Sequence, residues 1–493
     1  MGTIQQPWEQ IVSQKRAIRD KLLAPYLVDI EHRVPRIDNV DHRSRLENEP
    51  EVQIITDLDL ASLLKRLETG EFTTRQVIQA YIKRAVVAHQ LTNCLTEVLF
   101  DEALQQAQNL DAEFSNTEKL KGPLHGIPIT LKDQFNVQGV DSTLGYVGRS
   151  FQPASEDAVL VQILKDMGAI VIAKTNLCQS IMSSRFPYSG VPVSTSGQEH
   201  VPSSIGPMTR DLSSTIYITQ TITSSQPWTL DPRCVPLPWN EPIFQKTQSK
   251  PLVIGLILND GIVTPHPPIT RTLTELSTAL AAQGHELIPW DTSDHAGCIE
   301  IMDAFYTVDG GEDIRRDMAV GGEPYLPHVE ALVNRGKPIS VYEYWQLNKR
   351  KQSVQKRYLD KWNKTKSSSG REVDVLLAPA MPHTGIPHRT FKWVGYTKIW
   401  NFLDYTALTM PVDRVRREVD AVELGDGGEK YVPRNELDEW NWKLWDVDAV
   451  DGYPVNVQII GRKLEEEKVL GAASVIERVW KEYEEGKYGG KEE

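Results

Sequence analysis

The sequence has few cysteines and no long hydrophobic run. Its four cysteines, Cys94, Cys178, Cys234 and Cys298, stand far apart and show no metal-ligand spacing. A disulfide framework or a zinc site is therefore not expected. The chain contains no run of about eighteen apolar residues, and its first residues lack the apolar core of a signal peptide. We expect a cytoplasmic protein in a reducing compartment, without a membrane span.

The sequence also lacks an excess of positive charge and the best-known catalytic motifs. Its formal net charge is −13 at pH 7, whereas binding to nucleic acid needs clustered lysine and arginine. The motifs of zinc proteases, P-loop proteins, dinucleotide-binding proteins and nucleophile-elbow hydrolases are absent. His383 and His388 flank a turn of proline and glycine, and such a loop defines no metal-binding face. We expect neither a nucleic-acid partner nor a metal or cofactor.

The pattern of the N-terminal third predicts a layer of helices. An amphipathic helix is predicted over residues 8–24, before a proline. The leucines of residues 60–67 repeat at helical spacing, and Gly70 follows as a stop signal. Thr73 and Gln76 match a capping box that opens the next helix. This layer is expected to pack on a sheet and to have a structural role.

The stretch of residues 122–185 holds the most informative pattern. Apolar residues alternate over residues 127–131 and predict a short strand that ends at Lys132 and Asp133. A lysine in this position acts as a general base if desolvation lowers its pKa toward neutrality. Alternatively, its ammonium group reaches solvent while the adjacent Asp133 favours the charged form. Composition alone favours this second alternative.

A helix and a second strand follow in the same stretch. Ser155 is predicted to cap the helix, and the apolar run of residues 169–173 predicts a strand buried on both faces. A strand–helix–strand unit implies a parallel pair of strands in an α/β sheet. The carboxyl ends of parallel strands are the favoured place for catalytic groups, and Lys132 and Lys174 are both expected there.

Two other residues of the stretch are candidate catalytic groups. His125 precedes the first strand and is a candidate base, but the turn around it favours a structural residue held by hydrogen bonds. Cys178 follows the second strand, where a nucleophile can lie. A small buried thiol is the more common use of such a cysteine.

The rest of the chain continues the α/β pattern. Residues 186–214 are dense in glycine, proline and serine, which predicts a loop. The charged residues 414–440 are predicted to form a surface insertion. Strands are predicted over residues 252–258, 285–289, 373–378 and 455–460, and helices over residues 269–283, 342–366 and 464–483.

Five stretches of the sequence form a set that points to one family. They are GPLHGIPITLKDQF from Gly122, GAIVIAKTNL from Gly168, VDVLLAPA from Val373, NFLDYTALTMPV from Asn401 and DGYPVNVQIIGR from Asp451. Together they resemble the amidase signature family, and most closely its fungal acetamidase branch. The resemblance extends from about Trp8 to the last predicted helix.

The resemblance implies a fold, a reaction and one site residue. The family fold is an α/β fold with a large mixed β-sheet core wrapped by helices. The family hydrolyses the C–N bond of carboxamides to carboxylate and ammonia, using a nucleophilic serine, a bridging serine and a lysine base. Lys132 matches the lysine, whereas no role is assigned to Asp404 or Asp451. The resemblance implies a small amide as substrate and no cofactor, and it allows a homodimer because family members often pair.

One part of the family pattern has no counterpart in this chain. Family members carry a Gly/Ser-rich loop, a helix and a Gly-Gly-Ser segment with the nucleophile after the stretch that residues 176–182 match. Here Met182 is followed directly by Ser183, where the resemblance resumes. We therefore expect an N-terminal helical arm over residues 1–55 and a single amidase-like domain over residues 56–493, with a deletion at the 182/183 junction.

Three interpretations of this junction remain open. The sequence omits part of a working amidase, or the chain is a catalytically silent protein with a binding or regulatory role, or Ser183, Ser184 or Cys178 serves as an altered nucleophile. The abrupt junction favours the first interpretation, because gradual erosion would also have changed the stretch around Lys132. Loss of the segment is expected to uncover apolar faces and to lower stability and solubility.

Overall fold

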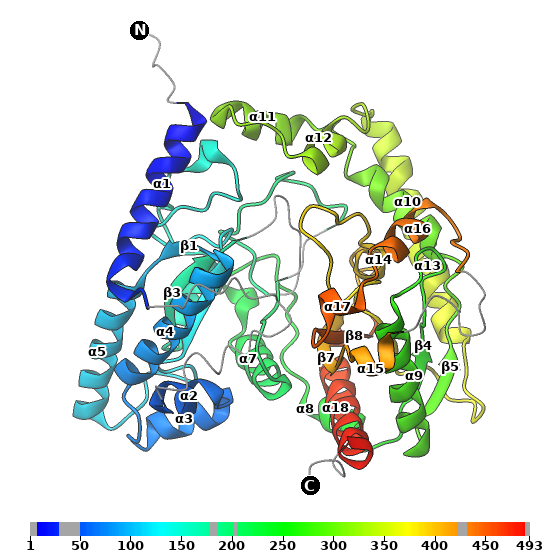
Figure 1. The fold of residues 1–493 in the computed structure, drawn as a ribbon, viewed down its shortest axis with the longest axis horizontal. Helices are drawn as coiled ribbons and strands as arrows, with labels where there is room; N and C mark the ends of the chain where they lie inside the picture. The colour runs from blue at the N-terminus through cyan, green and yellow to red at the C-terminus, as the bar shows by residue number, and fades with distance from the viewer. Residues whose placement is uncertain (1–6, 29–49, 177–185, 202–204, 422–430, 489–493) are drawn as a thin grey trace. The chain divides into compact units, whose positions relative to one another are not determined.

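The computed structural model describes residues 7–28, 50–176, 186–201, 205–421 and 431–488. These residues form two compact units. The first unit consists mainly of Asp41–Pro238 and Thr307–Ile339 together with the N-terminal helix. The second consists mainly of Trp239–Tyr306 and Ser340–Glu493. Each unit has its own sheet and its own covering helices (Figure 1).

The first unit contains the predicted N-terminal helical layer. Its helices are α1 (Trp8–Leu23), α2 (Pro50–Asp57), α3 (Leu60–Glu68), α4 (Thr74–Thr92), α5 (Phe100–Thr117), α6 (Val159–Asp166), α7 (Leu212–Ser224), α11 (Glu312–Gly321) and α12 (Pro327–Val333). The predicted capping box forms at the start of α4. The Thr73 hydroxyl accepts a hydrogen bond from the Gln76 amide (3.1 Å), and the Gln76 side chain accepts one from the Thr73 amide (2.8 Å). These bonds satisfy two N–H groups that the helix itself leaves without a partner.

A three-stranded sheet forms the centre of the first unit. Its strands are β1 (Leu95–Val98), β2 (Pro128–Lys132) and β3 (Ile170–Thr175), in the order β1-β3-β2. β2 and β3 are parallel, and β1 is antiparallel to β3. Ile170 and Ile172 pack with residues of α4 and α5, while Val171 packs with residues of α3 and α6. The central strand is therefore buried on both faces, as predicted.

The predicted start of the helix between β2 and β3 is wrong by three residues, because the N-cap is Ala158 instead of Ser155. Ser155 was expected to cap this helix, but α6 begins at Val159. The preceding residues stay extended because they pair with a distant segment: the Ala154 amide donates to the Val140 carbonyl oxygen at 2.9 Å. Ala158 keeps an extended backbone directly before the first helical residue. A tertiary pairing thus overrides the local capping preference.

The second unit is built around a five-stranded mixed sheet. Its strands are β4 (Val253–Leu256), β5 (Glu286–Pro289), β6 (Val375–Pro379), β7 (Ala407–Arg414) and β8 (Pro454–Ile460), in the order β5-β4-β6-β8-β7. β4 is parallel to β5 and β6, whereas β8 is antiparallel to β6 and β7. The predicted α/β class, with a mixed β-sheet core covered by helices, is therefore confirmed. The prediction placed the strands in one large sheet, whereas here they are divided between a three-stranded and a five-stranded sheet.

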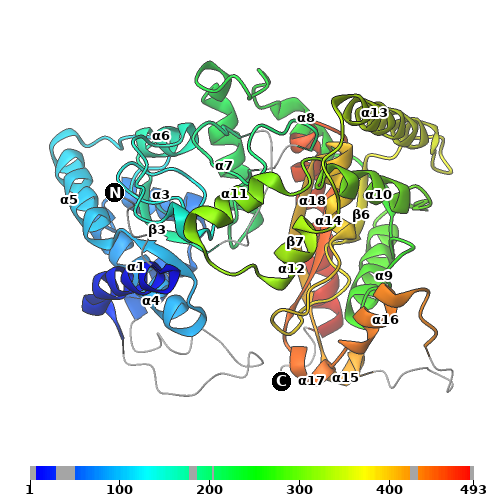
Figure 2. The ribbon, with the colours of Figure 1, turned by 90° about the horizontal axis from the view of Figure 1, so that it is seen from above.

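Helices cover this sheet along its length. They are α8 (Glu241–Gln248), α9 (Pro267–Ala282), α10 (His295–Phe305), α13 (Val341–Lys364), α14 (Gly395–Leu403), α15 (Arg417–Asp420), α16 (Glu436–Lys443), α17 (Val447–Val450) and α18 (Glu466–Tyr488). α9 and α18 contact each other and pack on the strands (Figures 1 and 2). Tyr358 and Trp362 of α13 are fully buried, and the Tyr358 hydroxyl accepts a hydrogen bond from the Trp290 indole at 2.9 Å.

Most of the later sequence predictions hold. The strands and helices predicted after residue 250 correspond to β4, β5, β6, β8, α9, α13 and α18. The loop predicted over residues 186–214 contains no helix or strand in its described part up to residue 211, but its last three residues belong to α7. The predicted surface insertion is only partly correct, because Asp420 and Asp438 within it are buried. Across the described ranges, no helix has the length and apolar character needed to span a bilayer.

Candidate active site

Lys132 lies at the carboxyl end of β2, as the sequence predicts. It is the last residue of the strand, is half-buried, and stands opposite Thr175 in the parallel ladder with β3. The next residue, Asp133, donates its amide N–H to the Thr175 carbonyl oxygen at 2.9 Å. The ladder therefore continues to the end of both strands and fixes the backbone on each side of Lys132.

The carboxylate of Asp133 ties the strand end to a loop. Its side chain is 1% exposed, and its Oδ2 atom accepts hydrogen bonds from the Thr143 hydroxyl (3.0 Å) and the Leu144 amide (2.8 Å). Its Oδ1 atom is buried without a hydrogen bond to any residue that the structure describes. Asp133 thus holds the loop in place with one oxygen, and a buried carboxylate of this kind needs a nearby positive charge.

Lys174 provides a second lysine at the same sheet edge. Its side chain is fully buried, and its ammonium group donates hydrogen bonds to the Asp141 carbonyl oxygen and to the Ser142 hydroxyl, the latter at 2.9 Å. Burial lowers the pKa of Lys174 to about 8, against the attraction of the carboxylates of Asp133, Glu97 and Asp141. The sequence placed this lysine at the strand end but gave no sign that it is buried.

Two of the acidic neighbours of Lys174 are paired with a third lysine. Lys15 of α1 lies 2.6 Å from a carboxylate oxygen of Glu97 and 2.7 Å from Oδ2 of Asp141. Burial opposes the charged form of Lys15, but the hydrogen bonds to Asp141 and Glu97 outweigh it and raise the pKa of Lys15. The N-terminal helix is therefore joined by one ion pair to β1 and by another to the loop that covers the strand ends.

His125 has the structural role that the sequence favoured. It is 2% exposed, its Nδ1 atom accepts a hydrogen bond from the Lys121 amide at 3.0 Å, and its Nε2 atom lies 3.4 Å from the Thr74 hydroxyl. Burial lowers the pKa of His125, so the ring is held neutral. Both ring nitrogens are thus engaged in holding the turn before β2.

The candidate nucleophiles of the sequence prediction lie outside the described residues. These are Ser183, Ser184 and Cys178, and the 182/183 junction lies outside the described residues with them. Of the described cysteines, Cys234 and Cys298 are buried and form no disulfide. Burial raises the pKa of their thiols to about 11 and about 12, which leaves both protonated near neutral pH.

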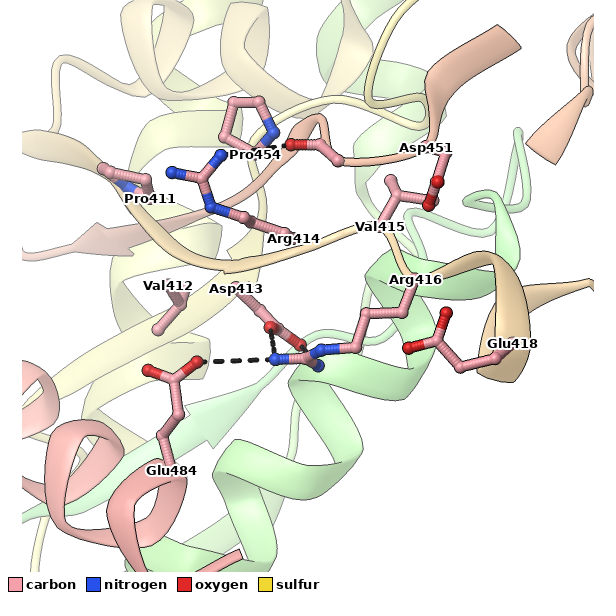
Figure 3. A pocket seen from close by; sticks show the side chains of 11 residues that line it. Pro411, Val412, Asp413, Arg414, Val415, Arg416, Glu418, Asp451, Pro454 and Glu484 are labelled. Carbon is pink, nitrogen blue, oxygen red and sulfur yellow. Dashed lines mark hydrogen bonds and ion pairs between the residues drawn. The ribbon is translucent and has the colours of Figure 1, made fainter. Parts of the chain in front are cut away.

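The second unit contains a cavity of about 430 Å³ between β7, α15 and α18 (Figure 3). Its lining residues are Pro411, Val412, Asp413, Arg414, Val415, Arg416, Glu418, Asp451, Gly452, Pro454 and Glu484. Figure 3 shows the Arg416 side chain directed toward Asp413 and Glu484, with distances of 2.6 and 3.4 Å. Arg271 also binds Asp413, at 2.6 Å. These charges pair with one another and hold β7 in place, and the cavity contains no nucleophile.

Among the described residues, no group of three or more His, Cys, Asp or Glu side chains is placed to hold a metal ion. His383 is buried and packs against Phe391 and Trp440, with ring centroids 5.9 and 6.3 Å apart. Its loop partner in the sequence, His388, is exposed. The two histidines therefore lie in different environments.

Comparison with known proteins identifies the family of this chain. A family model described as "Amidase" matches residues 76–191 and 183–470. The chain is 46% identical to Amidase 1 of Gibberella moniliformis over 538 aligned residues, which cover 96% of this chain and 99% of that protein. It is 30% identical to the acetamidase of Emericella nidulans, with coverage of 96% and 98%.

A solved structure gives the same result for the fold. The structure of a fatty acid amide hydrolase superposes with a TM-score of 0.86 at 25% sequence identity, covering 96% of this chain and 95% of that one. The family match spans most of the sequence, and the curated relatives are matched over almost their whole length. The chain therefore belongs to the amidase family, the family that its Lys132 stretch resembles.

Proposed function

We propose that this fold hydrolyses the C–N bond of a small carboxamide to a carboxylate and ammonia, with Lys132 as the base. The observation that carries the proposal is the position of Lys132 at the end of β2, within a stretch that resembles the family's lysine stretch. The names of the relatives, Amidase 1 and acetamidase, support a short linear amide as the substrate class.

The chemistry follows from the roles that the family resemblance implies. A neutral Lys132 takes a proton from a bridging serine, which in turn deprotonates the nucleophilic serine. The serine oxygen attacks the amide carbonyl, and backbone N–H groups stabilise the negative charge on the tetrahedral intermediate. As the C–N bond breaks, the amide nitrogen takes a proton back from Lys132 through the bridging serine and leaves as ammonia, and water then hydrolyses the acyl-enzyme ester to release the carboxylate and the free serine.

We further propose that both serines belong to a segment that this sequence lacks between Met182 and Ser183. Two observations support this. The two matched segments of the family model overlap over residues 183–191, so the match restarts at the junction. The alignment with Amidase 1 has 538 positions although it covers only 96% of the 493 residues of this chain, so more than 45 positions of the alignment have no residue of this chain. We also keep as a proposal the division into an N-terminal arm over residues 1–55 and a single amidase-like domain over residues 56–493.

A catalytically silent amidase fold is the second candidate function, and the junction is the observation that favours it. Loss of a nucleophile and its relay costs about 10⁴-fold or more in rate. A silent chain would keep the fold for binding or regulation. The altered nucleophiles Ser183, Ser184 and Cys178 form a third possibility that the same experiment separates.

The test compares the chain with a chimera that carries the segment of Amidase 1 aligned at the junction. Ammonia release from acetamide, propionamide and benzamide is measured for both proteins. We expect turnover by the chimera, no turnover by the chain itself, and loss of the chimera's activity in Lys132→Ala. Lys165→Ala, at an ion-paired surface lysine of α6, is the matched control and should keep full activity.

Each other outcome selects a different candidate. A folded chimera without activity contradicts the proposed hydrolysis and selects the silent fold. Activity of the unmodified chain selects an altered nucleophile. Sensitivity to iodoacetamide and loss in Cys178→Ala would then identify the thiol, and loss in Ser183→Ala or Ser184→Ala would identify a serine.

A cytoplasmic location and a homodimer are also proposals. The few scattered cysteines support the first, because they suit a reducing compartment. Pairing is common among amidases and supports the second. Light scattering on the purified protein tests the dimer, since a mass near the 55.7 kDa of one chain would contradict it.

A further inference from the structure

The loop of residues 139–146 crosses the carboxyl ends of β2 and β3. Its outer side is held by backbone pairing: the Gly139 amide donates to the Ala154 carbonyl oxygen at 2.9 Å, and the Ala154 amide donates to Val140 at the same distance. Its inner side is held by side chains of the two strands. Two different sets of contacts thus fix this loop over the strand end that carries Lys132.

Lys174 is an unusual anchor for such a loop. Its ammonium group is fully buried and donates to two uncharged acceptors, the Asp141 carbonyl oxygen and the Ser142 hydroxyl. It forms no ion pair within the described part of the chain. A methionine would fill the same space without desolvation cost, so a buried ammonium here needs a reason beyond packing.

The charges around Lys174 indicate which carboxylate it compensates. The groups that face it are Asp133, Glu97, Asp141 and Lys15. Lys15 pairs directly with both Glu97 and Asp141. Asp133 remains, buried and with one oxygen that has no hydrogen bond to a described residue. The charge of Lys174 therefore acts mainly on Asp133.

Hydrogen bonds through the loop connect Lys174 of β3 to the residues that follow β2. From Lys174, the Ser142 hydroxyl donates to the Phe135 carbonyl oxygen at 3.2 Å, just beyond the end of β2. The Leu144 amide donates to Asp133 Oδ2 at 2.8 Å, although Leu144 has a φ of 51° in the left-handed region. A leucine keeps this strained conformation only where its surroundings over-determine it.

We propose that Lys174 is a positioning residue, which clamps the loop of residues 141–144 onto β2 and compensates the Asp133 carboxylate, so that Lys132 is held at a fixed place and charge state. Lys174 is fully buried and cannot itself contact a substrate. It acts through Asp133 and the loop. Its consequence for catalysis rests on the proposed function of Lys132, but its structural consequence does not.

The first test measures hydrogen–deuterium exchange of the loop in Lys174→Met. Because the clamp is lost, peptides spanning residues 141–146 should exchange about tenfold faster or more than in the wild type, while peptides of α6 should be unchanged. Lys174→Arg, which keeps the charge and the donors, should restore much of the protection. Lys165→Met, at the surface of the same unit, is the control and should leave the loop protected.

The second test follows the reaction of the Lys132 amine with an acylating reagent as a function of pH, read by mass spectrometry. Loss of the Lys174 charge leaves the carboxylate of Asp133, the residue next to Lys132, uncompensated, and this favours the protonated amine of Lys132. The titration of Lys132 should therefore move to higher pH in Lys174→Met and should stay in place in Lys165→Met. If Lys174 only stabilised the fold, the pH at which the Lys132 amine titrates would be the same in Lys174→Met and in the wild type.

The outcomes separate this proposal from the proposed function. Unchanged loop exchange in a folded Lys174→Met, equal acceleration in the loop and α6, or an unmoved Lys132 titration would each overturn the proposal. If Lys174→Met does not fold, the double variant Lys174→Met/Asp133→Asn removes both buried charges and is measured in the same way. If the loop opens and Lys132 shifts while the chimera releases no ammonia, Lys174 keeps its positioning role and the proposed hydrolysis fails.

Discussion

Lowering the pH from 7 to 5 should destabilise the second unit through two buried histidines. His266 and His295 are 1% and 2% exposed. Burial lowers the pKa of both imidazoles from 6.5 to about 4. The folded chain therefore keeps both rings neutral at a pH where the unfolded chain protonates them.

The surroundings of His295 explain why its neutral form is required. The Trp290 indole can only donate, and it donates to the Tyr358 hydroxyl oxygen at 2.9 Å. The hydroxyl proton of Tyr358 is then left for Nε2 of His295, 3.1 Å away, which must accept it with a lone pair. Lys361 adds a repulsion that lowers the pKa further, and Asp294 opposes it. Protonation of the ring would break this chain of hydrogen bonds.

The size of the effect follows from linkage. A folded-state pKa below the unfolded value means that the unfolded state binds more protons, so stability is fully present above about pH 6.5 and is lost as the pH falls toward 4. Between pH 7 and pH 5, each histidine should cost about 2 kcal/mol of unfolding free energy. The two together amount to about 4 kcal/mol, a large part of the roughly 5–15 kcal/mol that stabilises a typical domain.

Urea denaturation followed by tryptophan fluorescence at pH 7 and pH 5 measures this loss. Between the two pH values, His295→Gln, which can still accept from Tyr358, should lose about 2 kcal/mol less unfolding free energy than the wild type. His388→Gln at an exposed histidine is the control and should show the wild-type pH dependence. The reasoning is refuted if His295→Gln loses as much stability between pH 7 and pH 5 as the wild type does.

Three further substitutions test single contacts by thermal or chemical denaturation. Arg271→Met removes the cation that lies 2.6 and 2.7 Å from the buried carboxylates of Asp413 and Asp420. Because Arg416 still pairs with Asp413 at 2.6 Å, the loss should be about 3 kcal/mol, at the lower end for a broken buried pair; a loss below about 1 kcal/mol would argue against a paired site. Thr73→Ala removes the capping box of α4 and should cost about 1 kcal/mol, whereas Thr73→Asn should cost much less. Gly168→Ala places a Cβ 2.8 Å from a neighbouring backbone atom at a φ of 95°, so it should lower the melting temperature by more than the usual effect of an exposed Gly→Ala change.

The parallel unit of the first sheet was predictable because its signals are local. The alternation over residues 127–131 and the apolar run over residues 169–173 mark strands by their own periodicity. Lys132 follows directly from the end of the first strand. The start of α6 was not predictable, since Ser155 has the right chemistry for a cap but its neighbour Ala154 is paired with Val140 across the loop. Local preference fails where a contact distant in sequence decides the backbone.

The role of Lys174 was hidden for a related reason. The sequence places it after an apolar run, where a lysine normally turns to solvent. Its burial depends on a loop about thirty residues earlier that supplies the Asp141 carbonyl and the Ser142 hydroxyl. The resemblance of the Lys132 stretch to a family identified the fold and suggested Lys132 as the base, but a resemblance carries over only residues that match a known role. The contacts of Lys174 with the loop can be recognised only in the three-dimensional structure.

The sheet edge also shows how far the site is complete without the residues at the junction. Asp133, Lys174 and Lys15 each bind the loop of residues 139–146 through side-chain contacts. Two neighbouring buried acceptors at the end of β2, Asp133 Oδ1 and Gln134 Oε1, have no hydrogen-bond partner among the described residues. Buried acceptors of native proteins are almost always paired, so these two atoms call for donors that come from elsewhere. A segment rich in glycine and serine supplies such donors as backbone N–H and hydroxyl groups. Under the proposed function, the strand end that carries Lys132 is built by this chain, and the two acceptors of the residues that follow it are candidate contact points for the missing segment.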